Sequence, residues 1–144
     1  VLRIFSAYGP GLRRQVLWEM ALQLARGENV QLKGTGDESR DFIHASDIAA
    51  AVKTVADRAP CRGEVYNVAS GMETGIREVA ELMTCFFPGA ASPEFAGQSI
   101  PGDPQRWRAD CQRLRELGFT QCVLLDKGLA SFAEWTKAQV TAKA

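Results

Sequence analysis

Gly34-Thr-Gly-Asp-Glu-Ser-Arg-Asp-Phe-Ile-His-Ala-Ser-Asp47 is the stretch that decides how this chain folds. Its two glycines permit backbone conformations that other residues rarely adopt, so they predict a tight loop. The apolar pair Phe42-Ile43 predicts a short strand. Ser46 or Asp47 is then expected to cap a helix over Ile48 to Ala56, by accepting hydrogen bonds from its first N–H groups. The stretch therefore predicts a loop, a strand and a helix in close succession.

Arg40 stands where the predicted loop passes into the strand. A guanidinium held at the mouth of a glycine loop is well placed to bind a phosphate, because its fork of N–H donors matches the phosphate oxygens. The alternative is an exposed arginine paired with Asp41 or Asp37. The residues of this stretch alone slightly favour that alternative.

The overall composition is that of one soluble globular domain. The chain has 144 residues, 46% of them hydrophobic and 24% charged, which is enough to bury a core. Lysine plus arginine equals aspartate plus glutamate at 17 each, so no net field attracts nucleic acid or anionic lipid. The apolar runs are too short to span a membrane. Four cysteines without a Cys-x-x-Cys pair, and a single histidine, favour free thiols in a reducing cytoplasm over a metal site.

Short strands are expected on both sides of the glycine loop. The chain opens with a strand-like run, Val1 to Phe5, which ends in a loop over Ser6 to Gly11. Because no polar residues precede this apolar run, we expect the chain to be a piece of a larger protein. Further strands are predicted at Val30 to Lys33 and at Glu64 to Val68.

Apolar residues recur at helical spacing in the segments between and after these strands. Helices are predicted at 16–26, at 76–86 with Thr74 as the N-cap, at 110–118, and around Leu129, Phe132 and Trp135. The chain is expected to fray from Thr136 to Ala144. Strands that alternate with helices indicate the α/β class, but these strands are too few and too short for a complete parallel sheet. The pattern therefore predicts a small mixed α/β lobe.

A second informative stretch is Pro101-Gly-Asp-Pro-Gln-Arg-Trp-Arg-Ala-Asp110. Asp103 can accept hydrogen bonds from ribose hydroxyls, Arg106 or Arg108 can meet a phosphate, and the Trp107 indole can stack on a ligand. The alternative is a Gly-Asp-Pro turn followed by a helix cap, and for Asp110 the capping role is preferred.

Three other polar residues call for a choice between a functional and a structural role. Gln15 and Glu19 lie on a flank of the first predicted helix that could face a ligand. The alternative is an ordinary amphipathic surface with a half-buried Trp18, and in isolation it is preferred. His44 is alone beside an apolar strand, so we expect it to be structural rather than catalytic.

Taken together, these segments resemble one family. Arg3-Ile-Phe-Ser-Ala-Tyr-Gly-Pro10, the stretch Gly34 to Asp47, Val65-Tyr-Asn-Val-Ala-Ser-Gly71, Gly102-Asp-Pro-x-x-Trp-x-Ala-Asp110 and Leu117-Gly118 occur in this order. The series resembles the C-terminal portion of the extended short-chain dehydrogenases/reductases, the NAD-dependent nucleoside-diphosphate-sugar epimerases and dehydratases. The resemblance covers nearly the whole chain, and its specificity comes from the order of the five motifs.

The resemblance implies an architecture and a set of site residues. An N-terminal Rossmann domain holds NAD(P) in this family, and a smaller C-terminal lobe binds the nucleotide-sugar. Residues 1–144 would be that lobe, and residues 1–10 within them would be the last Rossmann strand and its loop. The implied substrate-binding residues are Gln15, Val16, Glu19, Gln31, Leu32, Arg40 on the diphosphate, Asp103 on the ribose, Arg106 and Trp107; Phe5 and Ser6 would adjoin the nicotinamide.

The chain departs from the family pattern at two points. Ser6 stands where the family often has Asn. Ile100 and Pro101 stand where many members carry an arginine, so a second phosphate contact would have to come from Arg106 or Arg108.

The family's catalytic groups are absent from this sequence. It has no complete glycine-rich NAD loop, and Tyr8 and Tyr66 are not followed by a lysine four residues later. In the family's Tyr-x-x-x-Lys pair the tyrosine works as an acid and base and the lysine lowers its pKa. We therefore expect this chain to be the substrate lobe of a cytoplasmic epimerase or dehydratase. The lobe alone should be inactive and should bind no NAD(P). It should dock on a missing Rossmann domain or self-associate. The alternatives are a stand-alone binding module and an inactive gene remnant.

Overall fold

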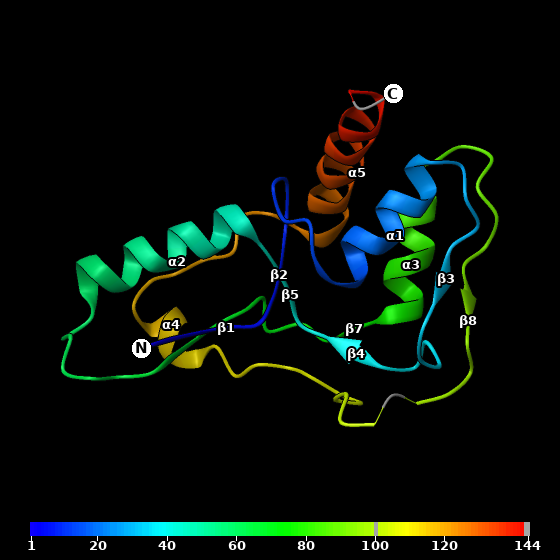
Figure 1. Ribbon diagram of the computed structural model, residues 1–144. Helices are drawn as coiled ribbons and strands as arrows, with labels where there is room; N and C mark the ends of the chain where they lie inside the picture. The colour runs from blue at the N-terminus through cyan, green and yellow to red at the C-terminus, as the bar shows by residue number, and fades with distance from the viewer. Residues whose placement is uncertain (100, 143–144) are drawn as a thin grey trace.

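A computed structural model describes residues 1–99 and 101–142 of the chain. Helices and short strands alternate, as expected for the α/β class (Figure 1). The strands are β1 (Leu2–Ile4), β2 (Ser6–Tyr8), β3 (Gln31–Leu32), β4 (Ser39–Arg40), β5 (Phe42–His44), β6 (Tyr66–Val68), β7 (Thr74–Gly75) and β8 (Glu94–Phe95). The helices are α1 (Gln15–Ala25), α2 (Ala45–Arg58), α3 (Ile76–Thr84), α4 (Gln112–Glu116) and α5 (Leu125–Thr141).

The strands form pairs that are mostly parallel. β1 pairs with β6, β2 with β5 and β3 with β8 in parallel, whereas β4 and β7 are antiparallel. The chain bends at Phe5, where the Ala7 N–H donates to the Phe5 carbonyl oxygen at 2.7 Å. The loop predicted to begin at Ser6 therefore begins later, because residues 6–8 continue as strand β2.

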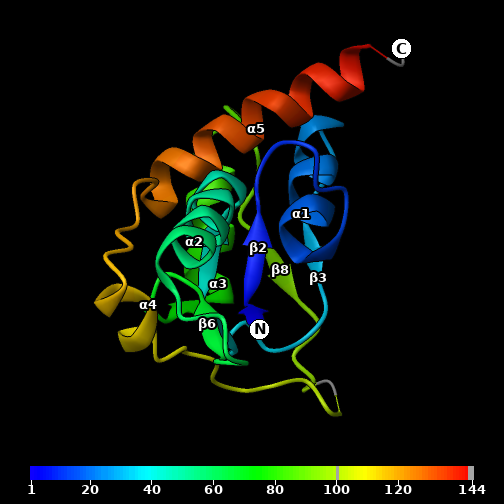
Figure 2. The ribbon, with the colours of Figure 1, turned by 90° about the vertical axis from the view of Figure 1, so that its left-hand side faces the viewer.

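Two apolar cores lie on either side of the central β2–β5 pair. Helices α1, α3 and α5 surround the larger core, and the views of Figures 1 and 2 show α5 crossing next to α1. Met20, Val79 and Phe132 are among its buried side chains. The smaller core lies between α2, α4 and strands β5 and β6, around Ile43 and Val68. The glycine loop after β3 and residues 101–108 before α4 run along the lower edge of this arrangement in Figure 1.

Gly128 allows α5 to pack closely on β2. A Cβ atom at position 128 would overlap the hydroxyl of Tyr8, which is 2% exposed. The Tyr8 hydroxyl has no hydrogen-bond partner among the described residues, and burial raises its pKa above the ordinary value. Tyr8 is thus a core residue in this structure.

Two predicted helix caps are wrong. Helix α2 begins at Ala45, and His44 caps it by accepting a hydrogen bond from the Ser46 N–H at its Nδ1 atom, so neither Ser46 nor Asp47 is the cap. The Asp47 carboxylate instead accepts from the N–H groups of Cys122 and Val123, each at 3.0 Å.

Thr74 is not the N-cap of α3, because it lies in strand β7 opposite Arg40, and Gly75 takes the capping position. The fraying predicted from Thr136 is also wrong for most of that segment. Helix α5 continues to Thr141, and Thr136 is fully buried with its hydroxyl donating to the Phe132 carbonyl oxygen. Residues 143–144 lie outside the described residues.

Candidate functional site

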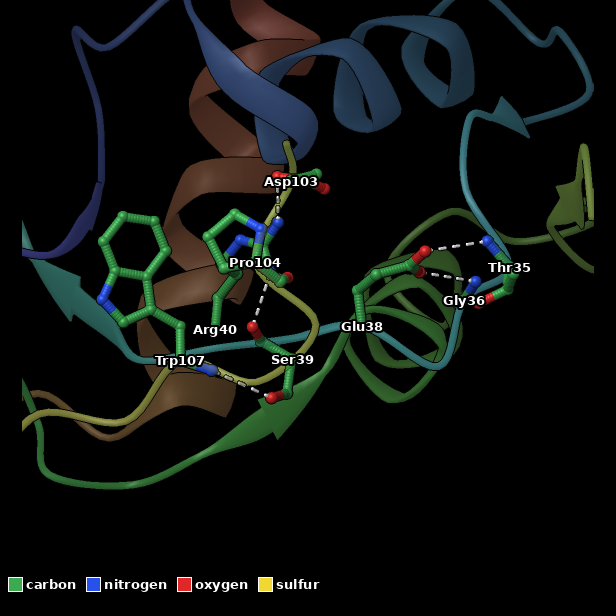
Figure 3. Close-up of polar contacts among 8 residues, drawn as sticks. All are labelled: Thr35, Gly36, Glu38, Ser39, Arg40, Asp103, Pro104 and Trp107. Atoms are coloured by element: carbon green, nitrogen blue, oxygen red, sulfur yellow. Dashed lines mark hydrogen bonds and ion pairs between the residues drawn. The ribbon is translucent and has the colours of Figure 1, made fainter. Parts of the chain in front are cut away.

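The glycine loop between β3 and β4 is closed from within by Glu38. Its carboxylate accepts hydrogen bonds from the N–H groups of Thr35 at 3.1 Å and Gly36 at 2.9 Å (Figure 3). Gly34 has φ +90°, and a Cβ atom there would lie 2.9 Å from Glu38 Oε1. Burial raises the pKa of the Glu38 carboxyl, but these hydrogen bonds outweigh it and hold the pKa below its ordinary value. The Glu38 carboxylate therefore holds the loop in a tight turn.

A second contact fixes the same loop from the side of α3. The Arg77 guanidinium donates to the Thr35 carbonyl oxygen at 2.7 Å and lies over the Phe95 ring, 4.4 Å from its centroid. Gly36 has φ +86°, and a Cβ atom there would lie 2.9 Å from both Arg77 and Phe95. Glycine is thus required at this position for two reasons, its backbone conformation and the close approach of these side chains.

Arg40 is held rigidly at the end of this loop. Its Nη1 atom donates to the carbonyl oxygens of Ser39 and Pro104, both at 2.7 Å, and its Nη2 atom forms an ion pair with Asp103 at 2.6 Å (Figure 3). The two side chains are 13% and 32% exposed. The sequence-based alternative of a pair with Asp41 or Asp37 is therefore wrong.

Asp41 points the other way, into the protein. It is fully buried, and its carboxylate accepts hydrogen bonds from the N–H and hydroxyl of Ser70, from the Gly71 N–H and from the Ala109 N–H. Asp41 thereby joins three chain segments and holds the segment 103–109 close to Arg40.

A cavity of about 290 Å³ opens beside the Arg40–Asp103 pair. It brings together most of the residues that the sequence suggested for substrate binding: Val16, Glu19, Gln31, Leu32, Arg40 and Asp103. A neighbouring cavity of about 410 Å³ shares the wall formed by residues 31–33 and continues to residues 94–96 of the β8 segment.

Three further residues line the smaller cavity and were not expected there: Lys33, Glu38 and Ile76. The alternation of strand β3 contained a signal for Lys33, because Gln31 and Lys33 are exposed on the face opposite the buried Leu32. Glu38 belongs to the glycine loop without being part of any recognised motif. Ile76 was attributed only to the apolar face of α3.

The remaining predicted substrate residues lie outside this cavity wall. Gln15 is exposed at the start of α1 and has an unusual φ of +68°. Arg106 is exposed. Trp107 is 42% exposed, and the Arg40 guanidinium lies 5.8 Å from its ring centroid, so it is next to the cavity without lining it. Ile100, which with Pro101 stands where many members of the family carry an arginine, lies outside the described residues.

Phe5 and Ser6, the residues expected near a nicotinamide, do not line either cavity. Their N–H groups are used by the strands, since Phe5 donates to the Val68 carbonyl oxygen and Ser6 to that of Asp41. The Phe5 ring meets Trp107 edge to face, with 5.6 Å between the centroids.

Two other kinds of site find no support in the part of the chain that the structure describes. No group of histidine, cysteine, aspartate or glutamate side chains there could hold a metal ion, and no helix there is long and apolar enough to cross a membrane. The cysteines are unpaired, as expected: Cys61, Cys85, Cys111 and Cys122. His44 caps α2, which is a structural role.

Comparison with known proteins points to one group of enzymes. Residues 1–69 match the NAD dependent epimerase/dehydratase family. The chain is 28% identical over 149 residues to a dTDP-L-rhamnose 4-epimerase from Burkholderia thailandensis, covering 99% of this chain and 41% of that protein. It is 30% identical over 138 residues to a dTDP-glucose 4,6-dehydratase from Streptomyces griseus, covering 94% of this chain and 42% of that protein.

A solved structure supports the fold. The UDP-glucuronic acid 4-epimerase from Bacillus cereus, in complex with UDP-glucuronic acid and NAD, superposes with a TM-score of 0.87 over 96% of this chain and 45% of that one, at 23% identity. The chain thus spans less than half the length of each of these proteins. Together the matches show that it is related to the nucleotide-sugar epimerases and dehydratases.

Proposed function

We propose that this chain is the nucleoside-diphosphate-sugar-binding portion of an NAD(P)-dependent sugar-nucleotide epimerase or dehydratase. Residues 1–144 form the C-terminal substrate lobe, with residues 1–10 as the last strand and loop of a Rossmann domain. The reaction of the whole enzyme is an epimerisation or a dehydration in carbohydrate metabolism. A cytoplasmic location accords with four unpaired cysteines.

The observation that carries this proposal is the convergence of distant motifs on one cavity. Val16 and Glu19 come from α1, Gln31 and Leu32 from β3, Arg40 from β4 and Asp103 from the loop before α4, yet all line the same wall. A cavity of this size accommodates part of a nucleotide-sugar and leaves the rest in the neighbouring cavity or in solvent.

In this proposal Arg40 binds the substrate diphosphate and Asp103 the ribose. Arg40 is oriented before the ligand arrives, because two backbone carbonyl oxygens and Asp103 fix its guanidinium. Its remaining N–H groups have no acceptor among the described residues, so they are available to phosphate oxygens. Gln15, Arg106 and Trp107 act at the edge of the site.

The chain alone is proposed to bind no NAD(P) and to be inactive, because the sequence lacks the Tyr-x-x-x-Lys pair. In the whole enzyme the nicotinamide cofactor would accept and return a hydride. The proposed partner of this lobe is a Rossmann domain. The large apolar residues Val1, Ile4 and Trp107, which are 72%, 50% and 42% exposed, support a docking surface around β1.

The test is calorimetric titration of the purified chain with UDP-glucose and dTDP-glucose, and with NAD as a second ligand. We expect the sugar nucleotides to bind and NAD to give no binding heat. Arg40→Ala should weaken sugar-nucleotide binding by about 1.5–3 kcal/mol, because a charge-assisted hydrogen bond is lost.

Arg58→Ala is the matched control, because Arg58 also donates to a backbone carbonyl oxygen, that of Leu117, but lies at the far end of α2. It should leave the affinity unchanged. Circular dichroism of each variant checks that the fold is intact. The proposal is wrong if neither sugar nucleotide binds the folded wild-type chain, and the role of Arg40 is wrong if Arg40→Ala binds as tightly as the wild type.

A further inference from the structure

The Phe95 ring forms part of the wall of the larger cavity, and a side chain from another element holds it there. Phe95 is half-buried and belongs to β8, a strand of two residues that pairs with β3. The Arg77 guanidinium, from the first turn of α3, lies 4.4 Å from the centroid of this ring, where a cation is attracted to the face of an aromatic ring. The place of the ring in the cavity wall therefore depends on α3 as well as on the β3–β8 pair.

The same arginine holds the glycine loop. Its Nη2 atom donates to the Thr35 carbonyl oxygen at 2.7 Å, and its backbone N–H donates to the Gly36 carbonyl oxygen at 3.1 Å. A Cβ atom at Gly36 would lie 2.9 Å from both Arg77 and Phe95, so the loop, the guanidinium and the ring are in direct contact. One side chain thus joins three segments that are far apart in the sequence.

Arg77 can act on the two cavities only through these neighbours. It lines neither of them, whereas Phe95 lines the larger one and Glu38 lines the smaller one. The Glu38 carboxylate accepts the N–H groups of Thr35 and Gly36, so it is oriented by the same part of the loop that the arginine holds. Arg77 forms no ion pair within 4.0 Å in residues 1–99 and 101–142, which leaves the ring and the carbonyl oxygen as the partners of its side chain there.

We propose that Arg77 is a positioning residue of the substrate site: it clamps the Phe95 wall of the larger cavity to the glycine loop beside the smaller one. This inference rests on the proposed function and adds to it a residue that acts without touching the ligand. A wall that is fixed before the ligand arrives does not have to be ordered on binding, and this lowers the entropic cost of binding. Loss of the clamp should therefore weaken binding although no contact with the ligand is removed.

The first measurement is backbone hydrogen exchange without ligand, followed by mass spectrometry. Arg77→Met keeps an unbranched stem and removes the charge and the N–H donors, and because Arg77 is exposed the fold should stay intact. We expect the peptide that covers residues 34–38 to exchange faster in this variant, whereas peptides of the α5 core keep the wild-type rate. Arg77→Lys should restore part of the protection, because it keeps a cation and a donor.

The second measurement is the affinity for the better-binding of UDP-glucose and dTDP-glucose, by calorimetry. We expect Arg77→Met to bind about fivefold more weakly than the wild type, since a clamp cannot change the affinity by more than it stabilises the binding-competent arrangement. Arg77→Lys should lie between the two.

Arg113→Met is the matched control. The Arg113 guanidinium also lies over an aromatic ring, 5.6 Å from the Tyr66 centroid, and donates to a backbone carbonyl oxygen, that of Val65, but lines neither cavity. It should match the wild type in both measurements. Unchanged exchange of residues 34–38 in Arg77→Met, faster exchange with unchanged affinity, or an equal effect of Arg113→Met would overturn the positioning role while leaving the proposed function intact. Failure of the folded wild-type chain to bind either sugar nucleotide would overturn both.

Discussion

Asp41 explains, at the scale of one residue, how the wall of the site is held in place. Its fully buried carboxylate accepts hydrogen bonds from the 70–71 turn and from Ala109, while its neighbour Arg40 points to the cavity. Adjacent residues of an extended segment face opposite sides. Asp41 can therefore brace the interior while Arg40 faces the cavity. The internal brace fixes the segment that supplies Asp103.

Asp41→Asn should destabilise the chain by about 2–3 kcal/mol. The substitution keeps the size of the side chain but replaces one acceptor oxygen with an NH2 group, which then faces backbone N–H donors in a buried place. Urea unfolding followed by circular dichroism measures the change. Asp37→Asn is the control, since Asp37 is exposed in the same loop, and it should change the stability by less than about 0.5 kcal/mol. Equal stabilities of the two variants would contradict the bracing role of Asp41.

The sequence identified Arg40 and Asp103 as interesting residues but not as partners. They are separated by 63 positions, and no local pattern reports an ion pair at that distance along the chain. Spacing therefore favoured the nearby Asp41 or Asp37. Lys33 was missed as a cavity residue for another reason, because it stands outside every motif and its one signal in the sequence was its alternation with Leu32 along the strand.

At the scale of elements, the start of α2 depends on the chain's single histidine. The neutral His44 ring accepts from the Ser46 N–H at Nδ1. Burial lowers the pKa of His44 below its ordinary 6.5, and the nearby Asp47 opposes this shift only in part. The unfolded chain therefore takes up the imidazole proton at a higher pH than the folded chain does. The contribution of this group to stability is complete above about pH 6.5 and is lost as the pH falls through the folded pKa.

His44→Asn should remove this pH dependence. Asparagine is a good N-cap and does not titrate, so helix α2 should still begin at the same residue. The measurement is the urea midpoint at several values between about pH 7.5 and 5.5, a range in which the ordinary pKa values of carboxyl groups are not reached. We expect the urea midpoint of the wild type to decrease as the pH is lowered, and that of His44→Asn to stay nearly constant. A parallel decrease in both proteins would assign the effect to other groups.

Helices were easier to predict than strands because each helix is long enough for its apolar spacing to repeat several times. The apolar spacing of α1 and α3 placed each start within one residue of the observed one. Strand β8 has two residues inside a stretch rich in proline and glycine, where no alternation can be read, and its pairing with β3 was not predicted. The capping errors at α2 and α3 arose because tertiary contacts claimed Asp47 and Thr74 for other bonds.

At the scale of the whole molecule, β1 forms an incomplete sheet with an apolar surface. In the described residues it pairs only with β6, which leaves one edge of the strand without a neighbour. Val1 and Ile4 are exposed along it, and Trp107 contacts Phe5 just after it. An open strand edge with apolar side chains favours pairing with another chain. The same surface is the one proposed above for a Rossmann domain.

We therefore expect the purified chain to self-associate through β1. Sedimentation velocity should show an average mass that rises with protein concentration, because burial of apolar surface stabilises the contact by about 25 cal/mol per Å². Ile4→Lys places a charge at the open edge and should keep the chain monomeric to a higher concentration. Leu124→Lys is the control, since Leu124 is 58% exposed but lies just before α5, away from β1. If the wild type is monomeric throughout, or if both variants change the association equally, β1 is not the surface through which copies of this chain associate.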